Sequence, residues 1–146
     1  ERLSVAAGSS RSDYLVSLQK SHCVSADNAH AVHPNYVDRH ELNNAPLINE
    51  GVVVKTNVSQ RYATSPNSFV PIVHAAATAG VNLQTFSSRN NIACGSTIGP
   101  ITATRIGIET VDIGVPQLSM HSIREMCGTK DPVDLVALLS AYFSRS

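Results

Sequence analysis

The sequence predicts an α/β fold in which a mostly parallel sheet is flanked by helices. Segments with strand character alternate with helical segments, which is the pattern of parallel strands joined by crossover helices. One strand, "GVVVKTN" at Gly51–Asn57, is a continuous β-branched run of the kind that is buried within a sheet. The chain has 146 residues, 42% of them hydrophobic, which suits one compact domain with a substantial core.

The first part of the chain contains short helices, a strand and a long loop. "ERLSVAA" at the start looks like the tail of a helix, and another short helix is expected near Asp13–Lys20. The segment "SHCVSAD" then runs as a strand that ends at Asp27. Residues His33–Asn49, with two prolines and four asparagines, predict an irregular loop before the strand at Gly51–Asn57.

The second part alternates more regularly. Pro66–Gly80 is expected to be helical, because proline is favoured early in a helix and glycine can cap its end. The closing segment 131–143 predicts an amphipathic helix, with Asp131 as the N-cap and Pro132 at the first position. Between these helices we expect a strand at 81–88, a helix at 100–107 and a strand at 108–114.

Composition argues against several classes of function. Eleven lysines and arginines balance eleven acidic residues, so no strong field attracts nucleic acid or an anionic membrane. No apolar run approaches the roughly 18 residues of a membrane span, and the opening residues do not match a signal peptide. The three cysteines lack C-x-x-C spacing, which argues against a cysteine-type zinc site and fits a reducing compartment.

Polar residues follow two of the predicted strands, at Asp27 and at Lys55. In open α/β sheets, ligands bind beyond the carboxyl ends of the strands, so these positions are functional candidates. Asp27 also begins a cluster with His30 and His33, three groups suited to metal binding or proton transfer. For Asp27 and His30 the alternative is a capped turn, because both residue types often satisfy loop backbone. Lys55 follows three valines and is costly to bury unless its ammonium reaches water or a partner, so its alternative is a side chain that extends from the strand end to solvent. His33, just before a proline, is interpreted as structural.

His121, in "QLSMHSIRE", is a second candidate metal ligand, between an apolar loop and a possible helix start. A lone histidine in an apolar stretch is more often a hydrogen-bonded core residue. A carboxylate and an imidazole from distant loops are nevertheless a usual way to hold zinc, which makes Asp27 and His121 a pair of interest. Two ligands do not make a site. His22, His40 and His74 show no pattern and are interpreted as surface or packing residues.

The segment "GSTIG" at Gly95–Gly99 precedes a predicted helix and offers backbone N–H groups to an anion. It lacks the lysine of a phosphate loop and the glycine spacing of a dinucleotide fingerprint. A tight strand-to-helix turn is therefore the preferred interpretation.

Four motifs carry a more specific signal when they are taken together and in order. They are "SADNAHAVHPNY", "VVVKTNVSQRYAT", "CGSTIGPITA" and "DIGVPQLSMHSIREMCGT". From about Val24 to the C-terminus, the chain closely resembles the C-terminal part of aspartyl aminopeptidases. Those are dinuclear zinc exopeptidases that remove acidic residues from peptide N-termini, so the resemblance implies part of a zinc-exopeptidase-like catalytic domain.

The resemblance assigns roles to individual residues. Asp27 of "SAD" and His121 of "SMHS" match zinc ligands. His30, Lys55 of "VVVK" and Tyr62 of "QRYAT" match substrate contacts. In the family, two zinc ions per active site lower the pKa of a bridging water, and a glutamate acts as the general base.

The chain also departs from the family pattern. It contains no Glu-Glu pair, one member of which is the family's general base, and it lacks the upstream His and bridging Asp ligands. The interposed domain that drives subunit association in the family is missing too. We therefore expect residues 1–146 to be the C-terminal portion of the catalytic domain, without a catalytic residue of its own.

The sequence thus predicts part of a zinc-dependent aminopeptidase that releases N-terminal Asp or Glu from peptides. By resemblance, the complete enzyme forms a large homo-oligomer, a dodecamer, in the cytoplasm, and the isolated chain is inactive. The alternative is a non-catalytic α/β interaction module that kept the fold and lost the metal site. The presence of both Asp27 and His121 argues against that alternative.

Overall fold

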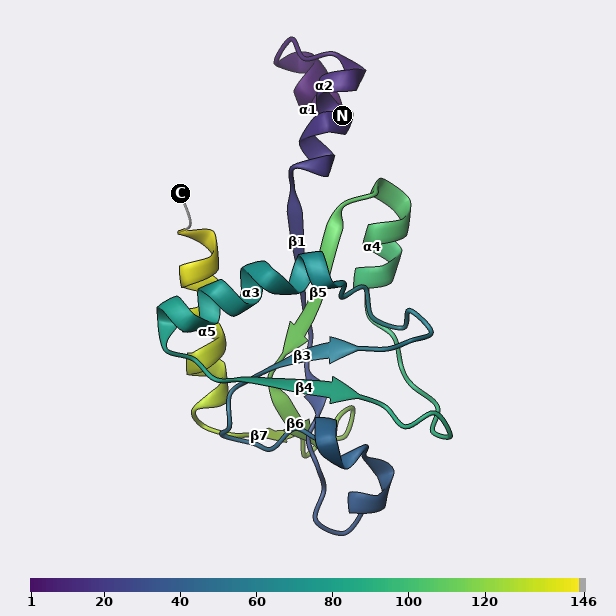
Figure 1. Cartoon of the computed structure of the whole chain (residues 1–146), viewed down its shortest axis with the longest axis vertical. Helices are drawn as coiled ribbons and strands as arrows, with labels where there is room; N and C mark the ends of the chain where they lie inside the picture. The colour runs from purple at the N-terminus through teal and green to yellow at the C-terminus, as the bar shows by residue number, and fades with distance from the viewer. Residues whose placement is uncertain (145–146) are drawn as a thin grey trace.

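The computed structural model describes residues 1–144 and confirms the α/β class (Figure 1). Its main sheet has four strands in the spatial order β1-β5-β3-β4. Their bounds are His22–Ala26 for β1, Val52–Thr56 for β3, Leu83–Ser87 for β4 and Glu109–Gly114 for β5. β1 pairs with β5 and β3 with β4 in parallel, whereas β3 and β5 are antiparallel. The sheet is therefore mostly parallel, as predicted.

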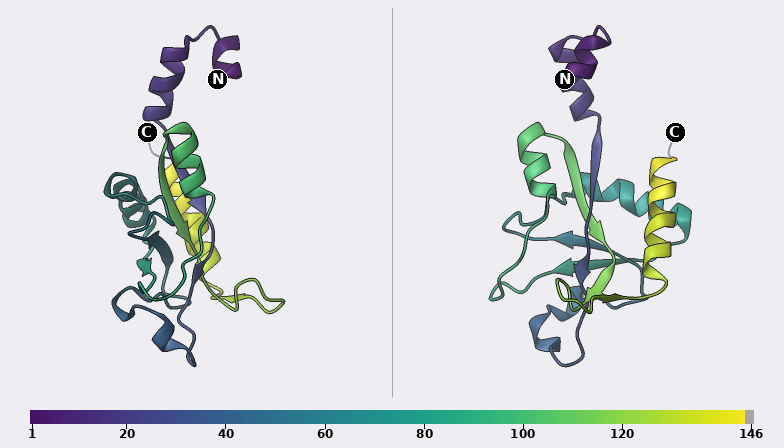
Figure 2. Two further views of the ribbon diagram at one scale, coloured as in Figure 1. Left: turned by 90° about the vertical axis from the view of Figure 1, so that its right-hand side faces the viewer. Right: turned by 180° about the vertical axis from the view of Figure 1, so that it is seen from behind.

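Alternation along β3 divides the interior into two layers. Val52 and Val54 belong to a cluster with Ile72 of α3 (Pro66–Ala79) and Leu138 of α5 (Asp131–Phe143). These two helices pack on each other and cover one face of the sheet (Figure 2). The opposite face carries Val53, which packs in a second cluster with Ala29, Tyr62 and Phe86. Because side chains alternate along a strand, Lys55 lies on this second face.

A small sheet extends the ladder between β1 and β5. Its strands are β2 (Ala29–His30), β6 (Pro116–Leu118) and β7 (Met126–Cys127), with β2 parallel to β6 and β6 antiparallel to β7. None of these short strands was predicted. Where the two sheets meet, the backbone at Gly114 passes very close to the backbone at Asp27. Only glycine permits this approach, because a Cβ at Gly114 would lie 1.6 Å from the carbonyl oxygen of Asp27.

Two short helices form an arm that projects beyond the sheet, as Figures 1 and 2 show. They are α1 (Arg2–Ala6) and α2 (Arg11–Gln19), and neither contains a buried residue. The loop at 33–49 is irregular, as expected, apart from the 3₁₀ turns η1 (Val37–Arg39) and η2 (Leu42–Asn44).

The remaining helical predictions hold with small corrections. α4 (Gly99–Ile106) lies where a helix was expected, and Gly80 ends α3 in the left-handed conformation, at φ 65°. Asp131 is not the N-cap of α5: Lys130 holds that position, and Asp131 is the first helical residue. Within residues 1–144, no helix has both the length and the apolarity needed to cross a bilayer.

Candidate functional site

Asp27 lies immediately after β1, at the carboxyl end of the parallel pair that β1 forms with β5. Its N–H donates to the carbonyl of Ile113 at 2.9 Å, which continues the ladder. One carboxylate oxygen accepts the N–H of Asn28 at 2.8 Å, and the other lies 3.7 Å from Nζ of Lys55. The side chain is 57% exposed, so the carboxylate is accessible to a further ligand.

His30 is held by the pairing of β2 with β6, three residues beyond Asp27. Its ring centroid lies 6.3 Å from that of Phe86. Burial lowers the pKa of His30, and the nearby charges of His121 and Lys55 lower it further. The contribution of His121 places that residue within electrostatic range of His30, although they are 91 positions apart in the sequence.

Lys55 is the most unusual residue of the site, because it is charged and only 1% exposed. Its ammonium donates to the carbonyl oxygen of Asn28 at 3.2 Å and lies 5.1 Å from the ring centroid of Tyr62. Burial lowers the pKa of Lys55, and the carboxylates of Asp27 and Asp112 oppose that shift. A side chain this buried does not extend to bulk solvent, which excludes the simple interpretation of a lysine reaching water from a strand end.

Tyr62 lies on the loop 57–65, between β3 and α3, and is 6% exposed. Its ring meets Phe86 edge-on, with 6.2 Å between the centroids. The thiol of Cys94 donates to the phenol oxygen at 3.5 Å. Burial, followed by that hydrogen bond, raises the pKa of Tyr62, so the phenol stays protonated and can donate its own hydrogen to a ligand.

His121 lies in the connection between β6 and β7. The backbone here forms turns, so the helix start that the sequence suggested at this position is wrong. His121 is exposed, has a left-handed φ of 68° and donates its N–H to Oε1 of Glu125 at 2.5 Å. Such a conformation is uncommon for a residue with a side chain, and Glu125 helps to hold it.

The donor chemistry at this edge of the sheet fits zinc, but only in part. A carboxylate from Asp27 and an imidazole from His121 are both usual zinc ligands. Residues 1–144, however, hold no group of three or more His, Cys, Asp or Glu side chains placed to share a metal ion. A protein zinc site needs at least three protein ligands, so the described residues can supply only part of one.

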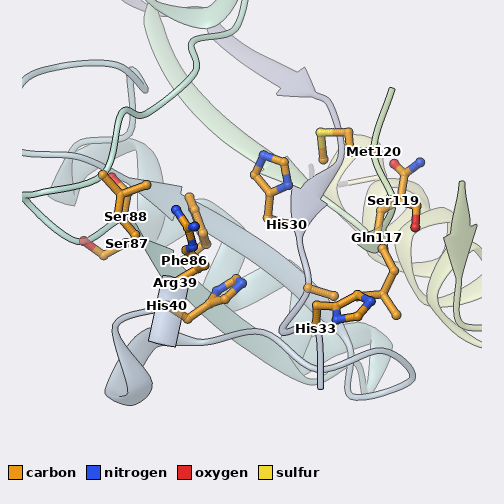
Figure 3. A pocket seen from close by; sticks show the side chains of 13 residues that line it. His30, His33, Arg39, His40, Phe86, Ser87, Ser88, Gln117, Ser119 and Met120 are labelled. Carbon is orange, nitrogen blue, oxygen red and sulfur yellow. The ribbon is translucent and has the colours of Figure 1, made fainter. Parts of the chain in front are cut away.

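A pocket of about 320 Å³ adjoins the site on the other side of His30 (Figure 3). Its lining is mostly apolar, and Phe86 at the end of β4 forms one wall. Figure 3 shows Arg39 and His40 beside Phe86, with His33, Ser119 and Met120 on the opposite side of the pocket. Gln117 also lines the pocket and is 5% exposed, and its Oε1 has no hydrogen-bond partner among the described residues.

Two of these pocket residues were not singled out from the sequence. His40 was interpreted as a surface or packing residue, but an isolated β-bridge to Ser88 brings it to the pocket. Burial lowers the pKa of His40, and His30 lowers it further. Gln117 carried no signal in the sequence beyond its position in the motif that contains His121.

The "GSTIG" segment ends a loop rather than forming a tight turn. β4 ends at Ser87 and α4 begins at Gly99, so eleven residues, 88–98, connect them. The hydroxyl of Thr97 donates to Asp112 at 2.6 Å and accepts the N–H of Gly99 at 3.2 Å. The start of α4 is thus next to an anion of the chain itself, the buried carboxylate of Asp112.

Comparison with known proteins identifies the family of the chain. The family model described as aminopeptidase I zinc metalloprotease (M18) matches residues 1–143. A probable M18 family aminopeptidase 2 from Pseudomonas savastanoi pv. phaseolicola is 49% identical over 135 residues, which cover 92% of this chain and 32% of that protein. The chain therefore spans about a third of the length of this curated relative.

Solved structures give the same result. The chain resembles a protein in the structure of the Ape4 and Nbr1 complex, with a TM-score of 0.89 and 48% identity over 92% of this chain and 26% of that one. It also resembles the mApe1 dodecamer from S. cerevisiae, with a TM-score of 0.79 and 30% identity over 90% of this chain and 28% of that one. The chain belongs to the M18 family of zinc metalloproteases, the family of aminopeptidase I.

Proposed function

We propose that residues 1–146 are the C-terminal portion of the catalytic domain of a zinc-dependent aminopeptidase that releases N-terminal Asp or Glu from peptides. Membership in the M18 family supports the aminopeptidase activity and the metal. In this proposal Asp27 and His121 bind zinc, and His30, Lys55 and Tyr62 contact the substrate. The other ligands of a two-zinc centre, and the glutamate that serves as general base, lie outside this chain.

The observation that carries the acidic specificity is the buried ammonium of Lys55. Burying a charge is costly unless a partner compensates for it. The only ion pair formed by Lys55 among the described residues is to Asp27, at 3.7 Å, and that carboxylate is the proposed metal ligand. If zinc takes the charge of Asp27, Lys55 is left to pair with another anion. The side-chain carboxylate of an N-terminal Asp or Glu would supply that anion, and Tyr62 would donate a hydrogen bond to the same peptide.

The proposal extends to assembly and location. One of the similar structures is a dodecamer, which supports a large homo-oligomer for the full-length protein. The balanced charge and the unpaired cysteines fit a cytoplasmic enzyme that acts on peptides rather than on nucleic acid or membranes.

The test compares Lys55→Met with the wild-type sequence in the full-length protein. Loss of one partner of a desolvated charge pair should cost aspartyl substrates on the order of 2–5 kcal/mol in kcat/KM. An alanyl substrate should be nearly unaffected, because it brings no carboxylate to pair with Lys55. The measurement is the ratio of kcat/KM for aspartyl and alanyl substrates in both proteins, with Lys130→Met as a surface control.

Two outcomes would contradict the proposal. An unchanged ratio in Lys55→Met would show that Lys55 does not select acidic N-terminal residues. A wild-type protein that binds no zinc and hydrolyses neither substrate would favour the interaction module that lost its metal chemistry.

A further inference from the structure

Asp112 is a fully buried carboxylate that has no part in the assignments above. It lies in the middle of β5, between Val111 and Ile113, and is 0% exposed. It forms no ion pair within residues 1–144 at the distances of a salt bridge. An ionised carboxylate in such a place is stable only if hydrogen bonds and nearby charges replace its hydration.

The carboxylate of Asp112 joins two loops. We call residues 57–65, which carry Tyr62, the Tyr62 loop, and residues 88–98 the Cys94 loop. One oxygen of Asp112 accepts the N–H of Ala63 at 2.6 Å, and the other accepts the hydroxyl of Thr97 at 2.6 Å. Both distances are short, as expected of hydrogen bonds to a charged acceptor, which are about twice as strong as neutral ones.

The two loops also touch each other directly. The hydroxyl of Ser96 donates to the carbonyl of Arg61 at 3.0 Å, and the thiol of Cys94 donates to Tyr62 at 3.5 Å. These direct contacts involve a partly exposed thiol and an exposed hydroxyl, whereas the bonds to Asp112 are shielded from water. The buried carboxylate is therefore the stronger part of the connection.

The surroundings leave Asp112 little freedom to move. Its backbone N–H donates to the hydroxyl of Thr64 at 3.0 Å. A Cβ on Gly99 would lie only 2.3 Å from the carboxylate, so the start of α4 can pass this point only with a glycine. Asp112 is thus fixed from the strand, from the Tyr62 loop and from the helix.

The charge of Asp112 has a use that hydrogen bonding alone does not explain. An asparagine could satisfy Ala63 and Thr97 without the cost of burying a charge. The carboxylate, however, is the second acid that favours the buried ammonium of Lys55, after Asp27. If Asp27 binds metal, Asp112 remains as a negative charge that favours the ammonium of Lys55 without forming an ion pair with it.

We propose that Asp112 is a positioning residue for substrate selection: it holds the Tyr62 loop against the Cys94 loop and so keeps Tyr62 beside Lys55. This role rests on the proposed function, because it assumes that Tyr62 and Lys55 contact the peptide. The connection between the two loops does not depend on that assumption and can be measured without turnover.

The experiment uses the full-length protein and four variants. Thr97→Val removes one hydrogen bond to Asp112 with little change of shape, and Thr97→Ser restores the hydroxyl. Asp112→Asn removes the charge and can keep both hydrogen bonds in neutral form. Asp134→Asn is the control, because it neutralises another buried carboxylate, on α5, away from these loops.

Two properties are measured for each variant. One is the rate at which iodoacetamide alkylates Cys94, followed by peptide mass spectrometry, with the exposed Cys127 as an internal reference. The other is the ratio of kcat/KM for aspartyl and alanyl substrates. Thr97→Val should raise the alkylation rate of Cys94 about tenfold, the factor that loss of a hydrogen bond to a charged group implies, and should lower the ratio. Thr97→Ser and Asp134→Asn should behave like the wild-type protein, and Asp112→Asn should lower the ratio with a smaller rise in alkylation.

The outcomes separate this inference from the proposed function. An unchanged alkylation rate in Thr97→Val would overturn the positioning role, and so would a raised rate with an unchanged substrate ratio. A wild-type protein that hydrolyses neither substrate would contradict the proposed function. In that case the alkylation rates would still decide whether Asp112 holds the two loops together.

Discussion

The two sides of the candidate site differ in how completely this chain builds them. On the Lys55 side, formed by Lys55, Tyr62 and Asp112, every side chain is at most 6% exposed and is held by contacts within the chain. On the proposed metal side, formed by Asp27 and His121, the carboxylate is 57% exposed and the histidine lies on an exposed turn. Buried polar groups must find partners, so the Lys55 side is preorganised, whereas the metal side is left open to further ligands.

The strongest test of this difference compares the 146-residue chain with the full-length protein. With only the two proposed zinc ligands, the chain alone should bind zinc at least about 10⁴-fold more weakly, since the binding free energy of a zinc site is shared among about four ligands. It should also hydrolyse no peptide. Zinc affinity is measured by competition with a chromophoric chelator, after circular dichroism has established that the chain is folded. Rapid turnover of an acidic aminoacyl substrate by the chain alone would contradict the difference between the two sides.

A smaller change addresses the metal side alone. His121→Ala in the full-length protein should reduce zinc occupancy and activity together, by more than the roughly 100-fold that loss of a ligand's hydrogen-bond partner costs. His33→Ala is the matched control, because His33 accepts the N–H of Asn35 and packs against Tyr36 instead. Zinc per protein is determined by elemental analysis. Equal losses in both variants would show that His121 is not a ligand.

The point where the two sides meet is tested by Gly114→Ala. A Cβ at Gly114 would overlap the carbonyl oxygen of Asp27 at 1.6 Å, so the backbone that carries Asp27 must move. We expect a loss of unfolding free energy on the order of 3 kcal/mol, with reduced zinc occupancy, because overpacking against backbone cannot be relieved by a rotamer change. Urea unfolding measures it. Gly95→Ala, where a Cβ meets nothing within 4 Å, is the control and should change stability little.

Much of the fold followed from local patterns in the sequence. The β-branched run at β3, the proline and glycine at the ends of α3, and the alternation of strands and helices all act over short distances. β2, β6 and β7 were missed because two or three residues are too few to show a period. Asp131 was predicted as the N-cap because an aspartate before a proline favours that position. Its carboxylate instead accepts the backbone N–H groups of Asn49 and Gly128, outside its own helix.

The site was predicted unevenly for a related reason. Residues in recognisable motifs, such as Asp27 and Lys55, were named, and Lys55 was identified as costly to bury because it follows three valines. Asp112 was passed over although it also interrupts an apolar strand, which is the signal that could have identified it. His40 reaches the pocket through a bridge to Ser88, a contact between positions 48 apart that no local pattern encodes.

The smallest expected effect concerns the N-terminal arm, which serves as a reference for both sides of the site because it contains no buried residue. A capping box begins α2: the hydroxyl of Ser10 accepts the N–H of Asp13 at 3.2 Å, and the N–H of Ser10 donates to the Asp13 carboxylate at 2.9 Å.

The hydrogen bonds from Ser10 lower the pKa of Asp13 in the folded helix. The cap therefore contributes fully above the ordinary pKa of aspartate, and its contribution is lost as the pH falls through the lowered pKa. Ser10→Ala should cost the helix about 1 kcal/mol of local stability and should reduce this dependence on pH, because it removes the hydroxyl and leaves the backbone N–H to donate to Asp13. Amide hydrogen-exchange protection within α2, measured from pH 6 down to about pH 2, reports the local effect.

At neutral pH the midpoint of urea unfolding should stay unchanged, because α2 buries nothing against the sheet. A shift of that midpoint in Ser10→Ala would mean that the arm packs on the rest of the protein and is not an independent element.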